Sequence, residues 1–302
     1  MSRKVAKRKS KPTVSIVGAG RLGKALAMSL SKAGYRIEAL VSRRRAHALK
    51  AAALVRHAAS ALGANELKLL PPSKVILITT PDDEIRSVAQ RLADAHGKRV
   101  QDRVVLHTSG ALSSEVLNPL AAVGFQVGSL HPLVSVSDPR TGQGALRGAF
   151  YCVEGDAAAA RRARVIVRDL KGQSFAIPSS NKPLYHAAAV MASGHVVALF
   201  DLAVEMLMQS GFSSANARRV LTPLLESTIK NLSKTNPARA LTGAFARGDL
   251  ATIQRHLQAL SKPGAARARE VYKTLGAQAL DLAKKNGVKI EVLSEIRKAL
   301  ES

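Results

Sequence analysis

The hydrophobic pattern of this chain changes at Pro178. Before that residue, short β-branched runs alternate with segments whose apolar residues have helical spacing, and after it the strand pattern is lost. Some runs, such as Val75–Thr79, are almost wholly apolar, as expected of strands covered by helices on both faces. The expected fold class is α/β, with a doubly wound domain over residues 13–178 followed by an all-α domain over residues 179–302.

Strands and helices are expected at definite positions in each half. The strand candidates are Val14–Val17, Arg36–Val41, Lys74–Thr79, Arg103–His107, Phe125–Leu130, Phe150–Val153 and Ser174–Ile177. Between them, helices are expected at Leu22–Ala33, Arg45–Leu62, Asp83–Ala95, Ser113–Leu120 and Ala157–Leu170. The second half is expected to hold one long helix, Lys182–Gln209, and further helices at Ser214–Leu232, Leu250–Ala259, Ala266–Asn286 and Ile290–Leu300. Helix breaks are expected at Gly211, Asn236-Pro237, Pro263-Gly264 and Gly287.

The chain is strongly basic, because 46 Lys and Arg residues against 21 Asp and Glu residues leave a formal net charge of +25. Six of the basic residues stand in the first twelve, MSRKVAKRKSKP, which contain no acid. Such a run is typical of a solvated, disordered tail, and contact with a phosphate-rich partner is the alternative. Aromatic residues make up only 3% of the chain and Trp is absent, which argues against a protein that stacks nucleic-acid bases. We therefore expect a disordered tail over residues 1–12 and no nucleic-acid partner.

Cysteine content and hydropathy indicate the cellular compartment in which the protein is expected. The single Cys152 excludes a disulfide within the chain and a multi-cysteine zinc site, and it fits a reducing cytoplasm. The longest apolar stretch, Val190–Leu207, is interrupted by a His, an Asp and a Glu, and falls short of the roughly 20 residues of a membrane span. The basic start is followed by too short an apolar run for a secretory signal. We expect a cytoplasmic protein with no membrane segment and no metal site.

Residues 18–23 have the pattern Gly-x-Gly-x-x-Gly and lie between an expected strand and an expected helix. They are Gly18, Ala19, Gly20, Arg21, Leu22 and Gly23. The first glycine permits a tight turn, the second lets the backbone approach a pyrophosphate, and the third allows close packing of helix on strand. The start of the helix adds free N–H groups and the positive end of its dipole. This context predicts the dinucleotide-binding loop of a Rossmann domain; a glycine-rich turn without a ligand is the alternative.

The end of the second expected strand indicates which dinucleotide binds. An NAD site needs a carboxylate about 20 residues after the glycines, to accept hydrogen bonds from a ribose hydroxyl. Ser42, Arg43 and Arg44 stand at that place, whereas Glu38 lies inside the strand, too early to reach the ribose. Guanidinium groups bind a 2′-phosphate with paired hydrogen bonds. We therefore predict NADP(H) as the cofactor; a solvated charge run is the alternative, above all for Arg45.

The polar residues at the end of the third expected strand of this half are expected to lie beside the cofactor. In a doubly wound sheet, ligands lie beyond the carboxyl ends of the strands. Thr79, Thr80 and Pro81 are therefore expected beside the cofactor's ribose and the phosphate on its nicotinamide side. Asp82 or Asp83 is expected to cap the following helix.

Two histidines, His107 and His131, end strands that open onto the same crevice, and Ser109 follows the first of them. Either histidine alone is typical of a structural residue. A substrate carbonyl or imine placed over the nicotinamide, however, needs hydrogen-bond donors at this place.

The first expected helix of the second half carries a polar stripe on an apolar surface. At 100° per residue, Lys182, His186 and Ser193 share a face, and His195 lies on the opposite side. Because buried polar groups need partners, the stripe predicts either a hydrogen-bond network between domains or a proton donor for hydride transfer.

These features predict an NADP(H)-dependent oxidoreductase that transfers a hydride to or from a small carbonyl or imine compound. The residues expected at its substrate end are Ser109, His131, Lys182 and His186. Two alternatives stay open: a non-catalytic NADP(H)-binding regulator or scaffold, and a nucleic-acid-associated protein. The apolar helices after residue 180 also predict a homodimer, since isologous dimers are the commonest oligomers.

Several longer motifs give the chain a resemblance to a known family. They are GAGRLG, TTPDDEI, HTSGALSSEVL, GSLHPL, KPLYHAAAVMASGH and ALTGAFARGDLATIQRHLQAL. On these motifs the sequence resembles the bacterial Rossmann-like oxidoreductases whose helical half is called domain of unknown function 2520. That family belongs to the group that includes 6-phosphogluconate dehydrogenase, ketopantoate reductase and pyrroline-5-carboxylate reductase. The resemblance covers nearly everything after the basic tail, and it implies a fold and a cofactor more than a particular reaction.

Two positions depart from the pattern of that family. Gly194 follows Ser193 where the family has Asn, and Ala244 follows Gly243 where the family has Pro. In related dehydrogenases a Lys and an Asn on the central helix contact the substrate. The resemblance therefore implies such a role for Lys182, whereas the amide is lost.

The late motif around residue 247 has two interpretations. The resemblance implies that Arg247, Gly248, Asp249 and His256 lie near the cleft of this chain or of a partner subunit. From the residues themselves, Gly248 and Asp249 are expected to form a turn and an N-cap for the helix Leu250–Ala259, with Arg247 paired locally.

Overall fold

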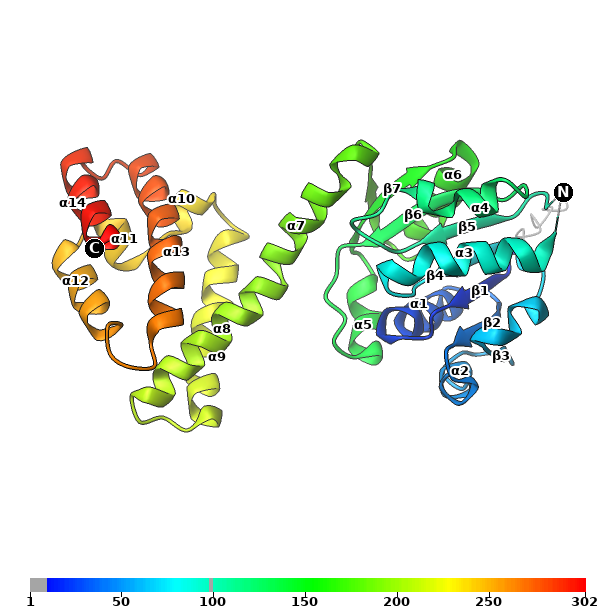
Figure 1. Cartoon of the computed structure of the whole chain (residues 1–302), viewed down its shortest axis with the longest axis horizontal. Coiled ribbons are helices and arrows are strands. Elements are labelled where there is room, and N and C mark those ends of the chain that lie inside the picture. Colours follow the sequence, from blue (N-terminus) through cyan, green and yellow to red (C-terminus); the bar gives the residue numbers. More distant parts are fainter. Residues whose placement is uncertain (1–9, 98–99) are drawn as a thin grey trace, which may run out of the picture. The chain divides into compact units, whose positions relative to one another are not determined.

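The computed structural model of the chain describes residues 10–97 and 100–302. It consists of two compact units, residues 1–193 and residues 194–302 (Figure 1). The boundary expected at residue 178 therefore shifts to 193, because the helix α7 (Lys182–Ala192) lies with the first unit.

The first unit is built on one eight-stranded sheet with the order β3-β2-β1-β4-β5-β6-β7-β8. Its strands are β1 (Val14–Val17), β2 (Ile37–Ser42), β3 (Ser60–Gly63), β4 (Val75–Ile78), β5 (Val104–His107), β6 (Gln126–Pro132), β7 (Phe150–Gly155) and β8 (Gln173–Phe175). All neighbouring strands are parallel except β6 and β7. The first six strands have the order of a doubly wound dinucleotide-binding sheet, which confirms the expected fold class.

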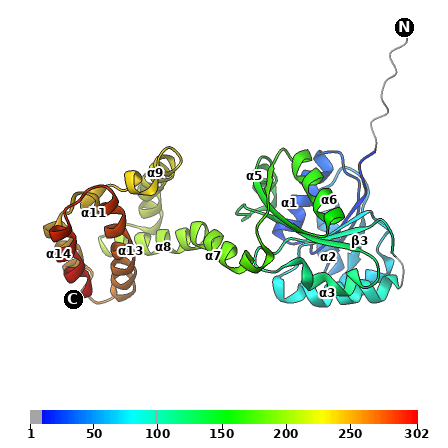
Figure 2. The ribbon, with the colours of Figure 1, turned by 90° about the horizontal axis from the view of Figure 1, so that it is seen from above.

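Helices cover both faces of this sheet. Figure 2 shows α1 (Arg21–Lys32), α5 (Pro139–Leu146) and α6 (Ala157–Asp169) on one face and α3 (Asp82–His96) on the other. The 3₁₀ helix η2 (Ser114–Leu117) and α4 (Asn118–Ala121) pack with α3, and α2 (Arg45–Ala52) lies beside β2 and β3. Because both faces are covered, β1, β4 and β5 are buried at every position, as their continuous apolar sequences predict.

Two helices expected in this unit are wrong in detail, and a third helix was not expected. The helix expected over Arg45–Leu62 ends at Ala52, and the rest of that segment contains the edge strand β3. The helix expected over Ser113–Leu120 is divided into η2 and α4. The unexpected helix α5 begins where the Asp138 carboxylate accepts hydrogen bonds from the N–H groups of Arg140 and Thr141.

The expected tail over residues 1–12 extends too far into the domain. Residues 1–9 lie outside the described residues, but Lys11 is fixed against the first unit. Its Nζ lies 2.8 Å from Asp169 Oδ2 and 4.8 Å from the centre of the Tyr35 ring. At least this one basic residue of the run therefore belongs to the fold.

The second unit is wholly helical in its described elements. They are α8 (Gly194–Gln209), α9 (Ser214–Leu232), α10 (Pro237–Ala240), α11 (Gly243–Arg247), α12 (Leu250–Ala259), α13 (Ala266–Lys285) and α14 (Ile290–Glu301). Its core is formed by buried residues of α12, α13 and α14. The long helix expected over Lys182–Gln209 is wrong as a single element, because α7 ends at Ala192 and Ser193 has non-helical angles.

The late motif of the second unit forms a turn and a cap. Gly248 ends α11 with a φ of 66°, and the Asp249 carboxylate accepts a hydrogen bond from Thr252 N at 3.0 Å, at the start of α12. The guanidinium of Arg247 lies 4.0 Å from Asp249. The expectation of a local turn and N-cap is thus confirmed.

One helical segment, Ser179–Gln209, is long and apolar enough to cross a membrane by length and composition alone. The mean hydropathy of its most apolar window is 1.8, and only 6% of that window is buried. The expectation that no apolar stretch reaches this length therefore needs correction. A single helix of this kind is weak evidence for a membrane span, and a break at Ser193 divides it.

Candidate functional site

The glycine-rich loop joins the carboxyl end of β1 to α1 and lies tightly against its neighbours. Gly18 has a φ of 111°, and a Cβ there would lie 2.6 Å from the backbone of Thr79. A Cβ on Gly23 would overlap the Gly18 carbonyl oxygen. These two glycines are therefore required by the close packing of the loop on α1 and β4.

Gly20 differs from the other two glycines, because a Cβ on it would meet no atom within 4 Å. No side chain caps the start of α1, so the N–H groups of its first turn are not bonded by a capping side chain. Ala19 is buried, whereas Arg21 is exposed at the first helical position and Leu22 is partly buried. The loop thus offers open space beside a helix start that attracts a phosphate.

The arginines after β2 differ in their surroundings. Arg45 lies 3.6 Å from Glu66, which also accepts a hydrogen bond from Gly63 N. Arg43 and Arg44 are exposed, and neither forms an ion pair within residues 10–97 and 100–302. Ser42 is the last residue of β2 and is partly buried. Arg45 begins α2 and pairs with Glu66, so it is not the purely solvated charge of the alternative. The guanidinium groups of Arg43 and Arg44 stay available to an anion.

Glu38 is held away from this place. It lies inside β2, and its carboxylate accepts a hydrogen bond of 2.5 Å from the Ser73 hydroxyl. The strand end therefore presents cationic side chains and no carboxylate of its own.

The end of β4 meets the glycine-rich loop. Thr79 donates its hydroxyl to the Gly18 carbonyl at 2.6 Å, so this side chain holds the loop in shape. The Thr80 hydroxyl is buried without a hydrogen-bond partner among the described residues, and Pro81 is the N-cap of α3. Thr80 lies against the glycine-rich loop at Gly18, and its unpaired buried hydroxyl fits a dinucleotide, whose phosphates and ribose offer hydrogen-bond partners.

Asp82 does not cap α3, contrary to the expectation for Asp82 and Asp83. The structure shows no side-chain cap on that helix, and Asp82 accepts a hydrogen bond from the Ser109 hydroxyl at 2.7 Å. The same Ser109 oxygen accepts hydrogen bonds from Ala111 N and Leu112 N. Ser109 therefore closes the turn after β5, and its hydroxyl proton is already donated.

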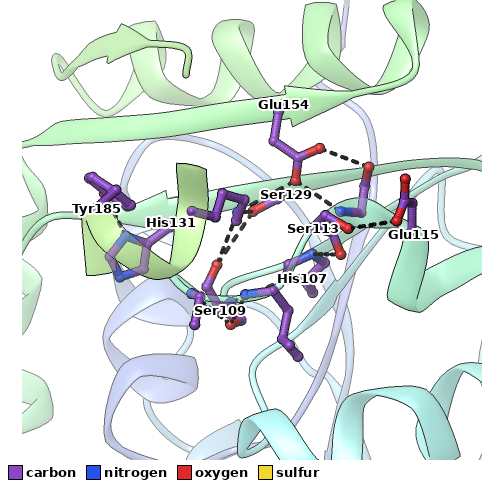
Figure 3. A network of polar contacts seen from close by, with 12 residues as sticks. His107, Ser109, Ser113, Glu115, Ser129, His131, Glu154 and Tyr185 are labelled. Atoms are coloured by element: carbon purple, nitrogen blue, oxygen red, sulfur yellow. Dashed lines mark hydrogen bonds and ion pairs between the residues drawn. The ribbon is translucent and has the colours of Figure 1, made fainter. Parts of the chain in front are cut away.

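Lys182 belongs to a buried polar network; Figure 3 labels its partners Ser109, Ser129 and Glu154. It is fully buried, and its Nζ donates to Ser129 Oγ at 2.6 Å and to the Ser109 carbonyl at 3.4 Å. It also lies 3.4 Å from Glu154 of β7, which accepts hydrogen bonds from the backbone and hydroxyl of Ser114. Burial lowers the pKa of Lys182, and the Glu154 carboxylate opposes that change. The ammonium thus joins α7 to the sheet.

His107 is fully buried beside this network and uses both of its ring nitrogens. Ser109 N donates to His107 Nδ1, so His107 Nε2 carries the proton and donates to the Ser113 carbonyl. Burial and the charge of Lys182 lower the pKa of His107 to about 3. This histidine is a neutral structural residue, in agreement with the structural alternative.

His131 has a different environment. Its Nδ1 lies 2.7 Å from the Tyr185 hydroxyl, and its ring lies edge-on to the rings of Tyr185 and His186, with both centres at 5.5 Å. Burial, together with the nearby His186 and Lys182, lowers the pKa of His131 to about 4, so the imidazole is neutral at pH 7. His186 Nδ1 is buried and has no hydrogen-bond partner among the described residues.

Gly110 allows the two imidazoles to approach each other. A Cβ on Gly110 would lie 2.8 Å from His131 Nε2 and closer still to His186 Nδ1. One nitrogen of each ring therefore faces the same small space beside the β5 turn. Any larger residue at this position would push the rings apart.

A cavity of about 250 Å³ adjoins these two imidazoles. Its wall is apolar except for the two histidines and two serines, and its lining residues are His131, Pro132, Leu133, Val134, Ser135, His186, Ala189, Val190, Ala192 and Ser193. The volume suits a small organic molecule, and the imidazoles supply its directional polar groups.

The four residues expected at the substrate end thus fall into two pairs. Lys182 and Ser109 lie inside the hydrogen-bond network, whereas His131 and His186 adjoin the cavity. Within residues 10–97 and 100–302, no group of three His, Cys, Asp or Glu side chains is placed to hold a metal ion.

Sequence reasoning did not identify Glu154, Ser129 or Tyr185 as members of the site. Tyr185 had a signal, because it lies beside His186 in the sequence. Glu154 and Ser129 had none, because their meeting depends on the antiparallel register in which they are paired.

Two family models match the chain in succession. A Rossmann-like domain matches residues 2–132, and the domain of unknown function DUF2520 matches residues 149–279. The protein is a Rossmann-like chain with a DUF2520 domain. The DUF2520 match begins just before β7, so this domain includes Glu154 and Lys182 together with most of the helical unit. A search of curated proteins found no match.

Solved structures show the same fold at low sequence identity. A Thermotoga maritima protein is 24% identical, with a TM-score of 0.69 over 91% of this chain and 99% of its own. A Bacteroides fragilis protein described as an NADP oxidoreductase is 21% identical, with a TM-score of 0.73 over 90% of this chain and 99% of its own. The Plasmodium falciparum pyrroline carboxylate reductase, solved with NADP bound, is 12% identical, with a TM-score of 0.52 over 97% of each chain. These similarities show the fold of the DUF2520 chain.

Proposed function

We propose that the protein is an NADP(H)-dependent oxidoreductase that transfers a hydride to or from a small carbonyl or imine compound. The observation that carries the proposal is the grouping of two features at one edge of the sheet. The open glycine loop follows β1, and the pair of imidazoles with its cavity follows β5 and β6. Because β1, β5 and β6 run parallel, their carboxyl ends lie at the edge where doubly wound sheets bind ligands.

The cofactor is held by the backbone of the glycine loop and by the arginines after β2. The first turn of α1 and Gly20 would hold the pyrophosphate, and Thr80 would offer its unpaired hydroxyl as a further hydrogen-bonding group. Arg43 and Arg44 would bind the 2′-phosphate, because they are exposed and pair with no carboxylate of the described residues. When bound, NADPH supplies the hydride.

At the substrate end, His131 and His186 hold the oxygen or nitrogen of the reacting group. Both rings present a nitrogen beside Gly110, and donors at this place stabilise the negative charge that develops there. Lys182 and Ser109 support the site from within the buried network, since their polar atoms are bonded to protein groups. This division narrows the four expected catalytic residues to two that face the cavity.

Cofactor affinities test the proposal. We expect calorimetric titration to show tighter binding of NADPH than of NADH by the unaltered protein. Arg43→Ala combined with Arg44→Ala should weaken NADPH binding at least about tenfold, since a hydrogen bond to a charged group contributes about 1.5 kcal/mol or more. NADH binding should not change. Arg45→Ala is the matched control, because Arg45 is already paired with Glu66.

Two results would contradict this assignment. Equal affinities for NADPH and NADH that do not respond to the double substitution would remove the cofactor choice. Tight NADPH binding without NADPH oxidation across a broad panel of carbonyl and imine compounds would contradict the proposed enzymatic activity. It would favour a cofactor-binding regulator.

We also propose that the protein forms a homodimer through α8 and α9. Each of these helices buries one residue, Val204 and Ala217 respectively, and neither contributes to the core of the second unit. Eight of their large apolar side chains are exposed, namely Val197, Leu199, Met206 and Met208 on α8, and Val220, Leu224, Ile229 and Leu232 on α9. Exposure of these eight apolar side chains to water is unfavourable. A second copy carries the same apolar surface, and pairing the two copies would bury both.

A further inference from the structure

His131 has a hydrogen-bond partner on one side of its ring only. Its Nδ1 lies 2.7 Å from the Tyr185 hydroxyl, as the dashed line in Figure 3 shows. Its Nε2 has no hydrogen bond to a described residue and faces Gly110, and His131 is one of the residues that line the cavity. The partner at Nδ1 therefore decides which nitrogen carries the proton, and so whether the cavity meets a donor or an acceptor.

The direction of this hydrogen bond follows from the chemistry of the phenol. The Tyr185 hydroxyl has no other hydrogen-bond partner among the described residues, so a proton that it did not give to His131 would have no acceptor there. Burial raises the pKa of Tyr185, and the phenol therefore keeps its proton at neutral pH. Because even a partly buried donor loses free energy without an acceptor, Tyr185 donates to His131 Nδ1.

We propose that Tyr185 is a positioning residue that holds neutral His131 in the Nε2–H tautomer, so that the ring presents a fixed hydrogen-bond donor to the cavity. The inference rests on the proposed function only for the identity of the ligand atom that accepts this bond. A lone pair of a carbonyl oxygen or of a neutral imine nitrogen fits the donor. An imidazole turned over would place a ring carbon at the Tyr185 hydroxyl and would lose this hydrogen bond.

The second unit contains a natural control pair. There, His256 Nδ1 lies 2.9 Å from the Tyr272 hydroxyl, and the two rings are edge-on with centres 5.8 Å apart. The pair repeats the contact between Tyr185 and His131, but it is not part of the proposed site. Tyr272→Phe therefore removes the same kind of hydrogen bond from another histidine.

The test measures the tautomer directly by proton–nitrogen correlation spectra of protein labelled with nitrogen-15 in its histidines. The His131 signals are assigned by their loss in His131→Gln. We expect unaltered protein at pH 7 to show His131 with a proton-bearing Nε2 and an unprotonated Nδ1. In Tyr185→Phe, both nitrogen shifts should move toward intermediate values, because the two tautomers then exchange. Tyr272→Phe should move the His256 signals and leave those of His131 in place.

An Nδ1–H tautomer or a mixture in the unaltered protein would overturn the proposal. So would an unchanged His131 spectrum in Tyr185→Phe. The reading from unaltered protein holds even if a variant folds poorly. The spectra need neither cofactor nor turnover, so a protein that never oxidises NADPH would contradict the proposed function and leave this inference standing.

Discussion

His107 and His131 end neighbouring strands, yet their hydrogen bonds give them different roles. Both nitrogens of His107 are bonded to the turn that follows β5, so this ring stabilises the turn. His131 has one nitrogen bonded to Tyr185 and the other beside the cavity. Equivalent positions at strand ends therefore hold one structural histidine and one histidine that can contact a ligand.

Stability should fall in mild acid because both imidazoles are neutral in the folded protein, where His107 is buried and His131 is half-buried. Burial, together with nearby positive groups, lowers the pKa of His131 to about 4 and that of His107 to about 3, whereas an unfolded histidine titrates near about 6.5. Below that value the unfolded chain binds protons that the folded chain excludes. The stabilisation is therefore complete above pH 6.5 and decreases as the pH falls toward 4, by up to about 1.4 kcal/mol per pH unit for each imidazole.

Urea unfolding followed by circular dichroism between pH 7.5 and pH 5 measures this change. His131→Gln should reduce the slope of unfolding free energy against pH, because one of the two groups is removed. His47→Gln, at an exposed position of α2, should leave the slope as it is. A slope that is equally steep in His131→Gln would contradict the assignment.

For single residues, the sequence was enough to predict which side chains stand at strand ends. It was not enough to predict the hydrogen bonds that those side chains form. His131 and Ser109 could be placed at the crevice because strand periodicity locates the carboxyl ends. Nothing in the sequence could show that Asp82, Ala111 and Leu112 already occupy the Ser109 hydroxyl, because those bonds depend on the path of two loops.

Helix α7 is attached to the sheet by the ion pair of Lys182 and Glu154. The lysine is fully buried and the carboxylate is almost so, and three serines complete their hydrogen bonds. A buried pair of this kind adds little net stability compared with apolar residues, but removing one partner leaves an unpaired charge. Its main effect is to fix where α7 begins, and with it the positions of Tyr185 and His186.

Glu154→Gln should lower the free energy of unfolding by about 3 kcal/mol, because it leaves the Lys182 ammonium buried without its counter-charge. Denaturant titration measures the loss. Glu115→Gln is the matched control, since Glu115 is exposed and should change stability by less than about 0.5 kcal/mol. Adding Lys182→Met to Glu154→Gln should restore part of the loss. If Glu154→Gln is as stable as Glu115→Gln, the ion pair of Lys182 and Glu154 does not have this role.

The elements themselves were predicted best where they carry explicit end signals. α9 and α12 have the expected bounds, since Ser213 and Asp249 cap their first turns. β3 was missed because its sequence, SALG, has no β-branched residue and is a strand only through its pairing with β2. The end of α7 at Ala192 was missed because apolar helical sequence continues on both sides of it.

For the whole molecule, the decisive quantity is the number of copies in solution. We expect light scattering at micromolar concentration to give twice the chain mass of 31.9 kDa, because the exposed apolar faces of α8 and α9 need a cover. Val220→Glu combined with Leu224→Glu places two charges one turn apart on the exposed face of α9 and should give the mass of one chain.

The matched control is Leu49→Glu combined with Leu69→Glu. Both leucines are exposed in the first unit, and this variant should keep the mass of the unaltered protein. If the unaltered protein has the mass of a single chain, the proposed homodimer is contradicted. Sedimentation with lipid vesicles, lost in the α9 variant, would instead assign the apolar face to a membrane surface.

The antiparallel pairing of β6 and β7 places Cys152 directly opposite His131 in the sheet. This thiol is the only one in the chain and is fully buried, and burial raises its pKa. A thiol reagent can therefore reach it only when this part of the sheet opens. The rate at which a thiol reagent modifies the unaltered protein therefore measures how often the sheet opens locally at β6 and β7, next to His131. Cys152 is thus a built-in probe of local unfolding at a single site.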